Sequence, residues 1–456
     1  MKLNDVLQNM EYSRFTGHAG AAVTGFCLDS RSLKKAEVFI CLDGRRHKGV
    51  DFIPEAVRKK ASAVIVDARY AKETQKFAGL CGVILVPDVM AAIRECARFW
   101  KSRFSVTTVA VTGSNGKTTT KELIAAILSR KFSVLRNERN FNNEIGVPLT
   151  LFRLNKSHQV LVIELGISKP GEMARLASMV RPEYAVITNI GSSHLEFLKT
   201  EPGVAREKSH LLDYTSKAVF LNQHNRFRDL LRRRGLARVT VHPFRRLADH
   251  RFDSAEPKGY DGWTVRCAGR RMDFSLYGEY NLDNLAMAIA VCRSLGVGAE
   301  DIAKAVSGFR DIGSRASVLK SGNVTVVDES YNANYSSLSR SIRFLSKVRT
   351  DGDKAAVIGE MKELGRRSRF LHGLIGTELT RTKIGRIVLT GHEARHIRRT
   401  CYPKSRVVWC ANRRELAKEA LALRTGRRPL TVLVKGSRSN RLDEVVDILK
   451  KKWRLE

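Results

Sequence analysis

The stretch Val109–Thr120, which reads V-A-V-T-G-S-N-G-K-T-T-T, limits the possible folds of this 456-residue chain more than any other segment. Residues 105–112 are mostly β-branched or apolar, which predicts a buried strand. Residues 121–132 predict a helix, because their apolar side chains recur on one face. Those side chains are Leu123, Ile124, Ile127 and Leu128. The segment Gly113–Lys117 is then a tight turn between a strand and a helix.

The composition of this turn is typical of a phosphate-binding loop. Gly113 and Gly116 let the backbone come close to a ligand, and the N–H groups at the start of the helix favour an anion. Lys117 adds a positive charge for the outer phosphates, and the hydroxyl group of Thr118 or Thr119 can hold Mg²⁺. The pattern T-G-x-x-G-K-T is shorter than the full phosphate loop. A glycine turn with a surface lysine is therefore the alternative interpretation.

Length and composition describe a globular protein. A chain of this length forms roughly three domains of common size, and 43% hydrophobic with 28% charged residues supplies ample cores. No apolar run approaches the roughly 20 residues of a membrane span, and the N-terminus shows no secretory signal. The eight cysteines lack metal-binding spacing and fit a reduced compartment. These features predict a cytoplasmic protein.

The charge balance is strongly basic. The 81 Lys and Arg residues against 46 Asp and Glu residues give a net charge of +35. Such a charge attracts anions, whether nucleotides, nucleic acid or an acidic membrane face. The densest basic stretch, residues 226–251, lacks aromatic residues at stacking spacing and any nucleic-acid-binding pattern. We therefore expect a solvated basic surface rather than a nucleic-acid partner.

Strand and turn patterns divide the chain into three units. Residues 1–103 contain short apolar strands broken by turns, with helices expected at 53–60 and 89–102. Residues 104–313 contain the phosphate loop, and residues 314–456 repeat a strand–helix rhythm. The strands of this last unit are expected at 324–328, 355–358, 386–389, 407–410 and 431–434. The predicted fold class is α/β, with a smaller N-terminal α/β domain, a central phosphate-loop ATPase domain with a parallel sheet, and a C-terminal Rossmann-like domain.

Polar residues in the central unit fall near the ends of expected strands. Glu164 lies near the end of the strand Val160–Leu165, and His194 follows the strand Tyr184–Ile190. Ligands gather beyond the carboxyl ends of parallel strands, so we expect Thr118, Glu164 and His194 to meet there. A hydroxyl and a carboxylate suit Mg²⁺, which prefers oxygen ligands, whereas an imidazole is less usual. Because burial of an unpaired carboxylate is costly, a functional role is favoured for Glu164.

Further candidates flank other strands and helices. Asp328 ends an expected strand, where a carboxylate can bind ribose hydroxyls. Lys435 and Arg438 form a small cationic loop that could contact phosphate or a substrate carboxylate. Asn281 and Asn284 lie near the start of an expected helix, where amides either cap the helix or contact a base. Spacing alone does not choose between these two roles.

Two loops carry additional polar side chains. The loop R-N-F-N-N-E-I-G-V-P has two adjacent amides, Asn142 and Asn143. The residues Asp29, Ser30 and Arg31 follow an expected strand, and together they could bind a diphosphate or a sugar. From spacing alone, a surface turn is the favoured interpretation of this tripeptide.

Seven motifs, spread over nearly the whole chain, carry a family resemblance. They are T-G-S-N-G-K-T, N-F-N-N-E-I-G-V-P-L-T-L, V-I-E-L-G, S-H-L-E, D-E-S-Y-N-A-N, G-E-M-K-E-L-G and L-V-K-G-S-R-S. Together they resemble the Mur ligase family, which builds the stem peptide of peptidoglycan; the first motif is also shared with folylpolyglutamate synthases. The S-Y-N-A-N, M-K-E-L-G and V-K-G-S-R-S set is similar to the members that add D-alanyl-D-alanine.

The resemblance implies a set of site residues, with ATP and Mg²⁺ as cofactors. The implied ATP contacts are Gly113, Ser114, Asn115, Gly116, Lys117, Thr118, Thr119, Asn281, Asn284, Arg315 and Asp328. The implied metal site consists of Thr118, Glu164, His194 and Lys208, and the implied catalytic residues are Lys117, His194 and Lys208. Lys208 matches a lysine that family members carbamylate. The implied substrate contacts are Asp29, Ser30, Arg31, Asn142, Asn143, Asn332, Asn334, Lys435 and Arg438.

The resemblance also implies a reaction and its partners. The expected enzyme is an ATP-dependent ligase that joins D-Ala-D-Ala to UDP-N-acetylmuramoyl-tripeptide through an acyl phosphate. A sister ligase or a folylpolyglutamate-type ligase that adds a single amino acid is the alternative. A nucleotide-dependent protein that binds nucleic acid represents a different class. We expect a monomer whose C-terminal domain closes onto the central one, and whose positive charge allows peripheral contact with the inner membrane surface.

Several family motifs are altered in this chain, and one of them lies on the adenine side. The usual pattern G-x-H-N reads G-E-Y-N here, so that Tyr280 stands where relatives have a histidine. The contacts on the adenine side are therefore expected to differ from those of the family.

Overall fold

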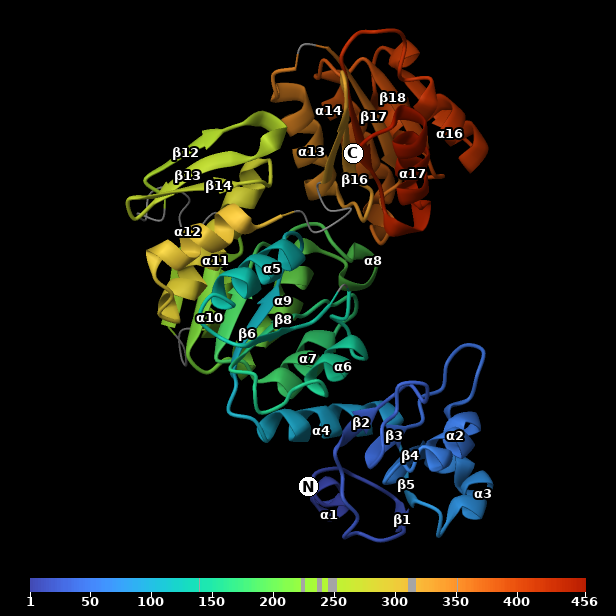
Figure 1. The fold of residues 1–456 in the computed structure, drawn as a ribbon. Helices are drawn as coiled ribbons and strands as arrows, with labels where there is room; N and C mark the ends of the chain where they lie inside the picture. Colours follow the sequence, from blue (N-terminus) through green and yellow to red (C-terminus); the bar gives the residue numbers. More distant parts are fainter. Residues whose placement is uncertain (139, 223–225, 236–239, 245–251, 311–316, 351) are drawn as a thin grey trace.

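In the residues that the computed structural model describes, the strands form four sheets, three of which follow one another as lobes along the chain (Figure 1). The described residues are 1–138, 140–222, 226–235, 240–244, 252–310, 317–350 and 352–456. None of the described helices is long and apolar enough to cross a membrane.

The N-terminal unit is a five-stranded sheet in the order β1-β5-β4-β3-β2, in which only β1 is antiparallel to its neighbour. Its strands are β1 (Arg14–Thr16), β2 (Gly25–Cys27), β3 (Glu37–Ile40), β4 (Ala63–Asp67) and β5 (Gly82–Val86). Its helices are α1 (Leu3–Leu7), α2 (Ile53–Arg58), α3 (Ala71–Thr74) and α4 (Val89–Ser102). The strands are short and apolar because the sheet is buried on both faces.

Helix α4 joins this unit to the centre of the molecule (Figure 1). Trp100, near its end, packs edge-on against Phe26 of the N-terminal sheet, with ring centroids 5.8 Å apart. The indole Nε1 of the same residue donates a hydrogen bond to the carbonyl oxygen of Leu154, at 3.3 Å. One side chain therefore ties the two units together.

The central unit is built on a six-stranded parallel sheet in the order β11-β10-β9-β6-β8-β7. Its strands are β6 (Thr107–Thr112), β7 (Val134–Arg136), β8 (Val160–Glu164), β9 (Tyr184–Ile187), β10 (Ala218–Asn222) and β11 (Thr240–Phe244). Its helices are α5 (Lys117–Leu128), α6 (Gly146–Leu151), α7 (Glu172–Val180), α8 (Leu195–Leu198), α9 (Glu201–Ser209), α10 (Arg228–Gly235), α11 (Glu279–Ser294) and α12 (Ala299–Gly308).

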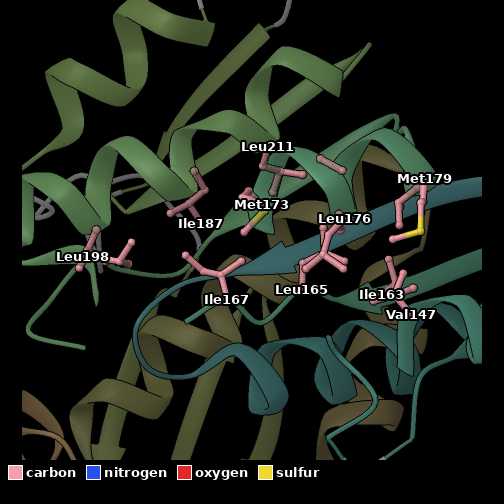
Figure 2. Close-up of a cluster of buried hydrophobic side chains, with 14 of the residues drawn as sticks. Val147, Ile163, Leu165, Ile167, Met173, Leu176, Met179, Ile187, Leu198 and Leu211 are labelled. Atoms are coloured by element: carbon pink, nitrogen blue, oxygen red, sulfur yellow. The ribbon is translucent and has the colours of Figure 1, made fainter. Parts of the chain in front are cut away.

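Alternating side chains of this sheet pack against two different helical layers. Val109 and Val111 of β6 lie in a core with α5 and α11, whereas Ala110 lies in the core that includes α6 and α7. Figure 2 shows part of the second core, which includes Ile163 of β8 together with Leu176 and Met179 of α7. This arrangement leaves the carboxyl edge of the sheet clear for a ligand.

A small antiparallel sheet of β12 (Ser254–Pro257), β13 (Trp263–Cys267) and β14 (Arg270–Phe274) follows the central strands. It packs beside α12, and the sequence patterns did not predict it. Its inward side chains, such as Val265 and Phe274, extend the core behind α11.

The C-terminal unit is a six-stranded sheet in the order β15-β16-β20-β17-β18-β19, with only β15 antiparallel. Its strands are β15 (Ser317–Ser321), β16 (Val324–Glu329), β17 (Asp353–Gly359), β18 (Arg386–Thr390), β19 (Val407–Cys410) and β20 (Leu430–Lys435). Its helices are α13 (Tyr335–Lys347), α14 (Ser368–Thr380), α15 (Arg395–Thr400), α16 (Arg413–Leu421) and α17 (Leu442–Trp453). All five strands that the sequence predicts in this unit are present.

Several predicted boundaries differ from the structure by a few residues, and two of them lie next to the phosphate loop. Helix α5 begins at Lys117 rather than Lys121, because Gly116 turns the chain directly into the helix. Strand β9 ends at Ile187 rather than Ile190, where the chain leaves the sheet to pack against the phosphate loop. The domain boundary at 313 falls within residues outside the described parts of the chain, so the three domain ranges stay a prediction.

Candidate active site

The phosphate loop connects β6 to α5 in a conformation that requires its glycines. Gly116 has a φ of +77°, and a Cβ atom there would lie 2.3 Å from Oδ1 of Asn284. Gly113 has a φ of +150°, and its Cβ would lie 1.9 Å from Oγ1 of Thr188. Both positions combine a left-handed backbone with a close neighbour, so a side chain would displace the loop.

Hydrogen bonds with the chain after β9 fix the conformation of the phosphate loop. The backbone N–H groups of Ser114 and Asn115 donate to the carbonyl oxygen and to Oδ1 of Asn189, at 2.9 and 3.0 Å. The Nζ of Lys117 donates to the carbonyl oxygen of Gly113 at 2.9 Å, which keeps its charge over the loop. The sequence patterns did not single out Asn189.

A cavity of about 720 Å³ lies where the phosphate loop faces the C-terminal unit. Its volume lies in the range of small-molecule sites. Many of the predicted site residues line it: Ser114, Asn115, Gly116, Lys117, Thr118, Thr119, Asn142, Asn143, Glu164, His194, Asn281, Asn284, Asn332, Asn334, Lys435 and Arg438.

Glu164 sits at the end of β8 beneath the loop, and is 1% exposed. The Oγ1 of Thr118 donates to its Oε2 at 2.5 Å, and the Nδ2 of Asn142 donates to its Oε1 at 2.7 Å. The amide of Asn137, which the sequence patterns did not single out, accepts from the N–H of Glu164 at 2.9 Å and donates to its carbonyl oxygen at 3.1 Å. Both the carboxylate and its backbone are therefore fixed.

This set of donors fits Mg²⁺ bound together with a nucleotide. Mg²⁺ usually takes one or two carboxylates, waters and substrate phosphates rather than a closed protein cage. Consistent with that, no group of three or more His, Cys, Asp or Glu side chains suited to a metal occurs among the described residues. The Glu164 carboxylate and the Thr118 hydroxyl, next to the phosphate loop, supply such a partial site.

His194 faces the C-terminal unit across the same cavity. Its Nδ1 lies 2.6 Å from Oε2 of Glu363. Burial lowers the pKa of His194 below its ordinary value, although the hydrogen bond with Glu363 opposes this shift. A neutral imidazole is the form that binds a metal.

Lys208 in α9 is fully buried, and its Nζ has no hydrogen-bond partner in the part of the chain that the structure describes. Burial lowers the pKa of this amine well below its ordinary value, and the nearby charge of Lys117 lowers it further. An unpartnered buried amine is costly for a structural residue. The surroundings of Lys208 therefore favour the uncharged form of its amine.

Asn281 and Asn284 lie inside α11 rather than at its cap, which is Gly278. The Nδ2 of Asn281 donates to the carbonyl oxygen of Tyr277 at 2.8 Å, and the Nδ2 of Asn284 donates to Oδ1 of Asn281 at 3.0 Å. Because a Cβ at Gly116 would meet Asn284, these amides form the floor of the phosphate loop. The capping alternative is therefore wrong.

The C-terminal unit contributes a buried carboxylate that the sequence patterns missed. Glu329 ends β16 one residue after Asp328 and is paired in register with Lys435 at the end of β20. The Nζ of Lys435 donates to Oε2 of Glu329 at 2.7 Å, and the Tyr277 hydroxyl donates to Oε1 at 2.6 Å. The hydroxyl of Ser341 donates at 2.6 Å. Glu329 belongs to the motif D-E-S-Y-N-A-N, one position after the predicted residue Asp328.

The hydroxyl of Tyr280 also donates to Oε1 of Glu329, at 3.3 Å, and so joins α11 to the C-terminal sheet. Burial raises the pKa of this hydroxyl well above its ordinary value, as does the negative charge of Glu329. The tyrosine that replaces the family histidine is thus a protonated donor across the junction.

Asn115 in the phosphate loop makes two further bonds to the C-terminal unit. Its Nδ2 donates to Oγ of Ser336 at 2.7 Å, and its Oδ1 accepts from Nδ2 of Asn334 at 2.8 Å. Arg438 lines the cavity but pairs with Asp443, at 2.9 Å.

Other predicted residues lie away from the cavity. Arg31 is an exposed partner of Asp29 at 2.7 Å, and the hydroxyl of Ser30 donates to Glu55 at 2.5 Å. These three residues belong to the N-terminal unit and do not line the cavity. Asp328 does not line it either; its Oδ1 accepts from the N–H of Ser330. Arg315 lies outside the described residues.

Comparisons with known proteins agree with this architecture. The family model for the Mur ligase middle domain matches residues 111–292, and the model for the Mur ligase glutamate ligase domain matches residues 314–438. A UDP-N-acetylmuramoyl-tripeptide–D-alanyl-D-alanine ligase from Treponema pallidum is 30% identical over 463 residues, which cover 99% of both chains. The ligase of the same name from Bacillus subtilis is 28% identical over 96% of this chain and 94% of its own length.

Solved structures are similar over the same span. The MurF ligase from Thermotoga maritima in complex with ADP has a TM-score of 0.81 at 28% identity, covering 95% of this chain and 98% of its own. MurF from Acinetobacter baumannii has a TM-score of 0.88 at 24% identity, covering 99% of this chain and 98% of its own. The predicted fold class and family are confirmed. Since the similarity extends over all three units and both family models match, the chain belongs to the Mur ligase family of ATP-dependent ligases.

Proposed function

We propose that this ligase joins D-Ala-D-Ala to UDP-N-acetylmuramoyl-tripeptide at the cost of ATP. The observation that carries the proposal is a cavity that brings the phosphate loop, Glu164 and His194 together with Lys435 and Arg438. One half can hold a triphosphate, and the other carries Lys435 and Arg438, which pair with Glu329 and Asp443 in this structure. The names of the similar ligases support the choice of substrates.

The reaction proceeds in two steps whose atoms balance. A carboxylate oxygen of the tripeptide attacks the γ-phosphorus of ATP, the bond to the β-phosphate oxygen breaks, and ADP leaves. The free amine of D-Ala-D-Ala then attacks the acyl carbon of the acyl phosphate. The tetrahedral intermediate loses phosphate and a proton, and an amide remains.

The protein acts mainly by alignment and charge neutralisation. Lys117 neutralises the outer phosphates, and the backbone N–H groups at the start of α5 bind them. Thr118 and Glu164 would hold one Mg²⁺, and His194 would hold a second. When bound, the metal ions would stabilise the negative charge of the transferring phosphoryl group. The remaining ATP contacts that we propose are Asn281, Asn284, Arg315 and Asp328.

Lys208 has a proposed role as a carbamate. Its uncharged amine attacks CO₂, a C–N bond forms, and one proton is released, which leaves a carboxylate-like group. This change turns a buried nitrogen that has no hydrogen-bond partner among the described residues into an anion that can bind a metal. The low pKa of the amine supports the proposal, because only the unprotonated form is nucleophilic.

In this proposal, the two units on either side of the central unit bind the parts of the substrates that do not react. Asp29, Ser30 and Arg31 bind the UDP end in the N-terminal unit, and the dipeptide lies at the C-terminal side of the cavity. The proposed contacts there are Asn142, Asn143, Asn332, Asn334, Lys435 and Arg438. The enzyme acts as a cytoplasmic monomer whose C-terminal domain closes on ligand binding, and its basic surface allows contact with the inner membrane.

The test is phosphate release from ATP with purified protein, Mg²⁺ and both substrates, each omitted in turn. We expect release only when both substrates are present, together with a UDP-muramoyl pentapeptide identified by mass. Release with a shorter nucleotide-peptide and one amino acid would assign a sister reaction instead. Tight ATP binding without release would favour the nucleotide-dependent binding protein.

A pair of lysine variants completes this test. Lys117→Ala should lower kcat at least about 100-fold, because a charge aimed at the transferring phosphate is lost. Lys131→Ala, which removes an exposed lysine just after the end of α5, is the matched control and should keep normal turnover. A folded Lys117→Ala protein with near-normal turnover would refute the role of the loop.

A further inference from the structure

We infer that Glu363 is a positioning residue for His194, which is a metal ligand in the proposed function. Glu363 belongs to the loop after β17 in the C-terminal unit, and His194 to the loop after β9 in the central unit. On this inference the metal-binding imidazole is held in place only when the two units are docked. Nothing in the sequence patterns paired these two residues.

The first observation is the geometry of the pair. The Nδ1 of His194 lies 2.6 Å from Oε2 of Glu363, and both residues line the cavity. With Nδ1 bound to a carboxylate as the N–H tautomer, Nε2 is the nitrogen that can bind a metal. Carboxylates placed in this way fix the orientation and tautomer of metal-ligating histidines and raise their basicity.

The second observation is the backbone on both sides of the contact. His194 has a φ of +56° and Glu363 a φ of +61°, and this left-handed region is unfavourable for residues other than glycine. Such conformations persist where the surrounding structure requires them. Here the two left-handed conformations occur at His194 and Glu363, the residues that face one another across the junction.

The third observation is a set of backbone contacts that bring the two loops together. The N–H of Glu196 donates to the carbonyl oxygen of Glu363 at 2.9 Å. A Cβ atom on Gly365 would lie 3.0 Å from Cα of Glu196, so the two chains are in close contact. The pair is therefore part of a built interface rather than a chance surface contact.

A functional consequence follows from the origin of the two residues in different units. If docking orients His194, then metal affinity and docking are coupled, and each must favour the other by the same factor. The metal site at His194 would then be complete only after the C-terminal unit docks and places Glu363 next to His194.

The experiment measures metal binding in the full-length protein, with Mn²⁺ as the probe and a non-hydrolysable ATP analogue present. Free Mn²⁺ is followed by its electron paramagnetic resonance signal. Glu363→Ala should weaken the Mn²⁺ site at His194 by about 10- to 100-fold. Glu363→Gln, whose amide oxygen still accepts from Nδ1–H, should weaken it less than tenfold. Glu419→Ala removes a carboxylate elsewhere in the C-terminal unit and should match the unaltered protein.

A second variant separates this inference from the proposed function on which it rests. If His194→Ala leaves Mn²⁺ binding unchanged, the metal role of His194 fails, and the inference fails with it. If His194→Ala weakens binding but Glu363→Ala does not, only the inference is overturned. Circular dichroism of each variant checks that the fold is intact.

Docking gives a readout that does not depend on metal affinity alone. Addition of Mn²⁺ and the ATP analogue should slow hydrogen exchange in the peptide 191–199, whose Glu196 amide is bonded to Glu363. In Glu363→Ala this protection should be smaller by at least about tenfold in exchange rate. Equal protection in both proteins would contradict the coupling.

Discussion

Replacing Lys435 with methionine tests the physical argument for the buried ion pair with Glu329. The two side chains are 6% and 7% exposed, and Nζ lies 2.7 Å from Oε2. Methionine keeps most of the length of the lysine stem but removes its charge. The Glu329 carboxylate would then stay buried with only neutral donors around it.

The expected loss of stability follows from these contacts. Removal of one partner of a buried ion pair costs about 3–5 kcal/mol, because the other charge is left unpaired. The hydroxyls of Tyr277 and Ser341 still donate to Glu329, at 2.6 Å each. We therefore expect Lys435→Met to lower the free energy of unfolding by about 3 kcal/mol, at the lower end of that range.

A double-mutant cycle isolates the pair from its surroundings. Glu329→Gln should cost about as much as Lys435→Met, because the lysine is then the unpaired charge. The double variant buries neither charge, so it should cost no more than either single change. The coupling energy is then about 3 kcal/mol.

Urea unfolding at pH 7, followed by far-ultraviolet circular dichroism, measures all four proteins. Lys452→Met, which changes an exposed lysine of α17, is the matched control and should cost less than about 0.5 kcal/mol. A single variant that loses less than about 1 kcal/mol, or a double variant whose cost is additive, would refute the reasoning.

The pH dependence provides a second check on the same pair. Burial acts to raise the pKa of Glu329, but the charge and hydrogen bond of Lys435, together with the hydrogen bonds from Ser341 and Tyr277, outweigh it, so the pKa lies below the ordinary value of 4.5. The contribution of Glu329 to stability is therefore full above the ordinary value and is lost as pH falls through the lowered one. In Lys435→Met, burial raises the pKa, and the hydrogen bonds from Tyr277 and Ser341 oppose it without the charge of Lys435, so the stability deficit should shrink as pH falls from about 7 to about 5. A deficit that is constant over that interval contradicts the assignment.

Two further substitutions test single contacts. Gly116→Ala should abolish ATP-analogue binding, since its Cβ would lie 2.3 Å from Oδ1 of Asn284 at a φ of +77°; Gly298→Ala, with open space around it, is the control. Unchanged affinity would show that the loop tolerates the side chain. Trp100→Phe removes the 3.3 Å hydrogen bond to Leu154 and should cost about 1 kcal/mol. Differential scanning calorimetry should show a Tm lower by about 2 °C, and an identical Tm would mean that the bond contributes nothing.

The phosphate loop was predictable from the sequence because local rules determine it. Gly113 and Gly116 adopt backbone angles that other residues avoid, and the alternation of β6 sorts Val109 and Ala110 into opposite cores. Such features depend on a few consecutive residues. The same reasoning found Glu164, because the carboxyl end of a parallel strand is where ligands meet.

Contacts between distant segments were not predictable in this way. Glu329 and Lys435 are register partners 106 residues apart, and Tyr277 and Tyr280 reach the same carboxylate from another unit. A sequence pattern marks that each residue is polar near the end of an element, but not which partner it meets. For the same reason the pair of His194 and Glu363 became visible only in the folded chain.

The location of the cavity follows from the orientation of the two large parallel sheets. Strands β6 and β8 of the central sheet and strands β16 and β20 of the C-terminal sheet end in residues that line or adjoin the same cavity. Parallel strands place all their carboxyl ends at one edge, so two such sheets can face one another and enclose a ligand from both sides. Each sheet then supplies only half of the necessary groups, the phosphate loop and Glu164 from one, Lys435 and Arg438 from the other. Neither unit alone holds the complete set, so a reaction in this cavity requires that the two units stay docked while the phosphoryl group moves.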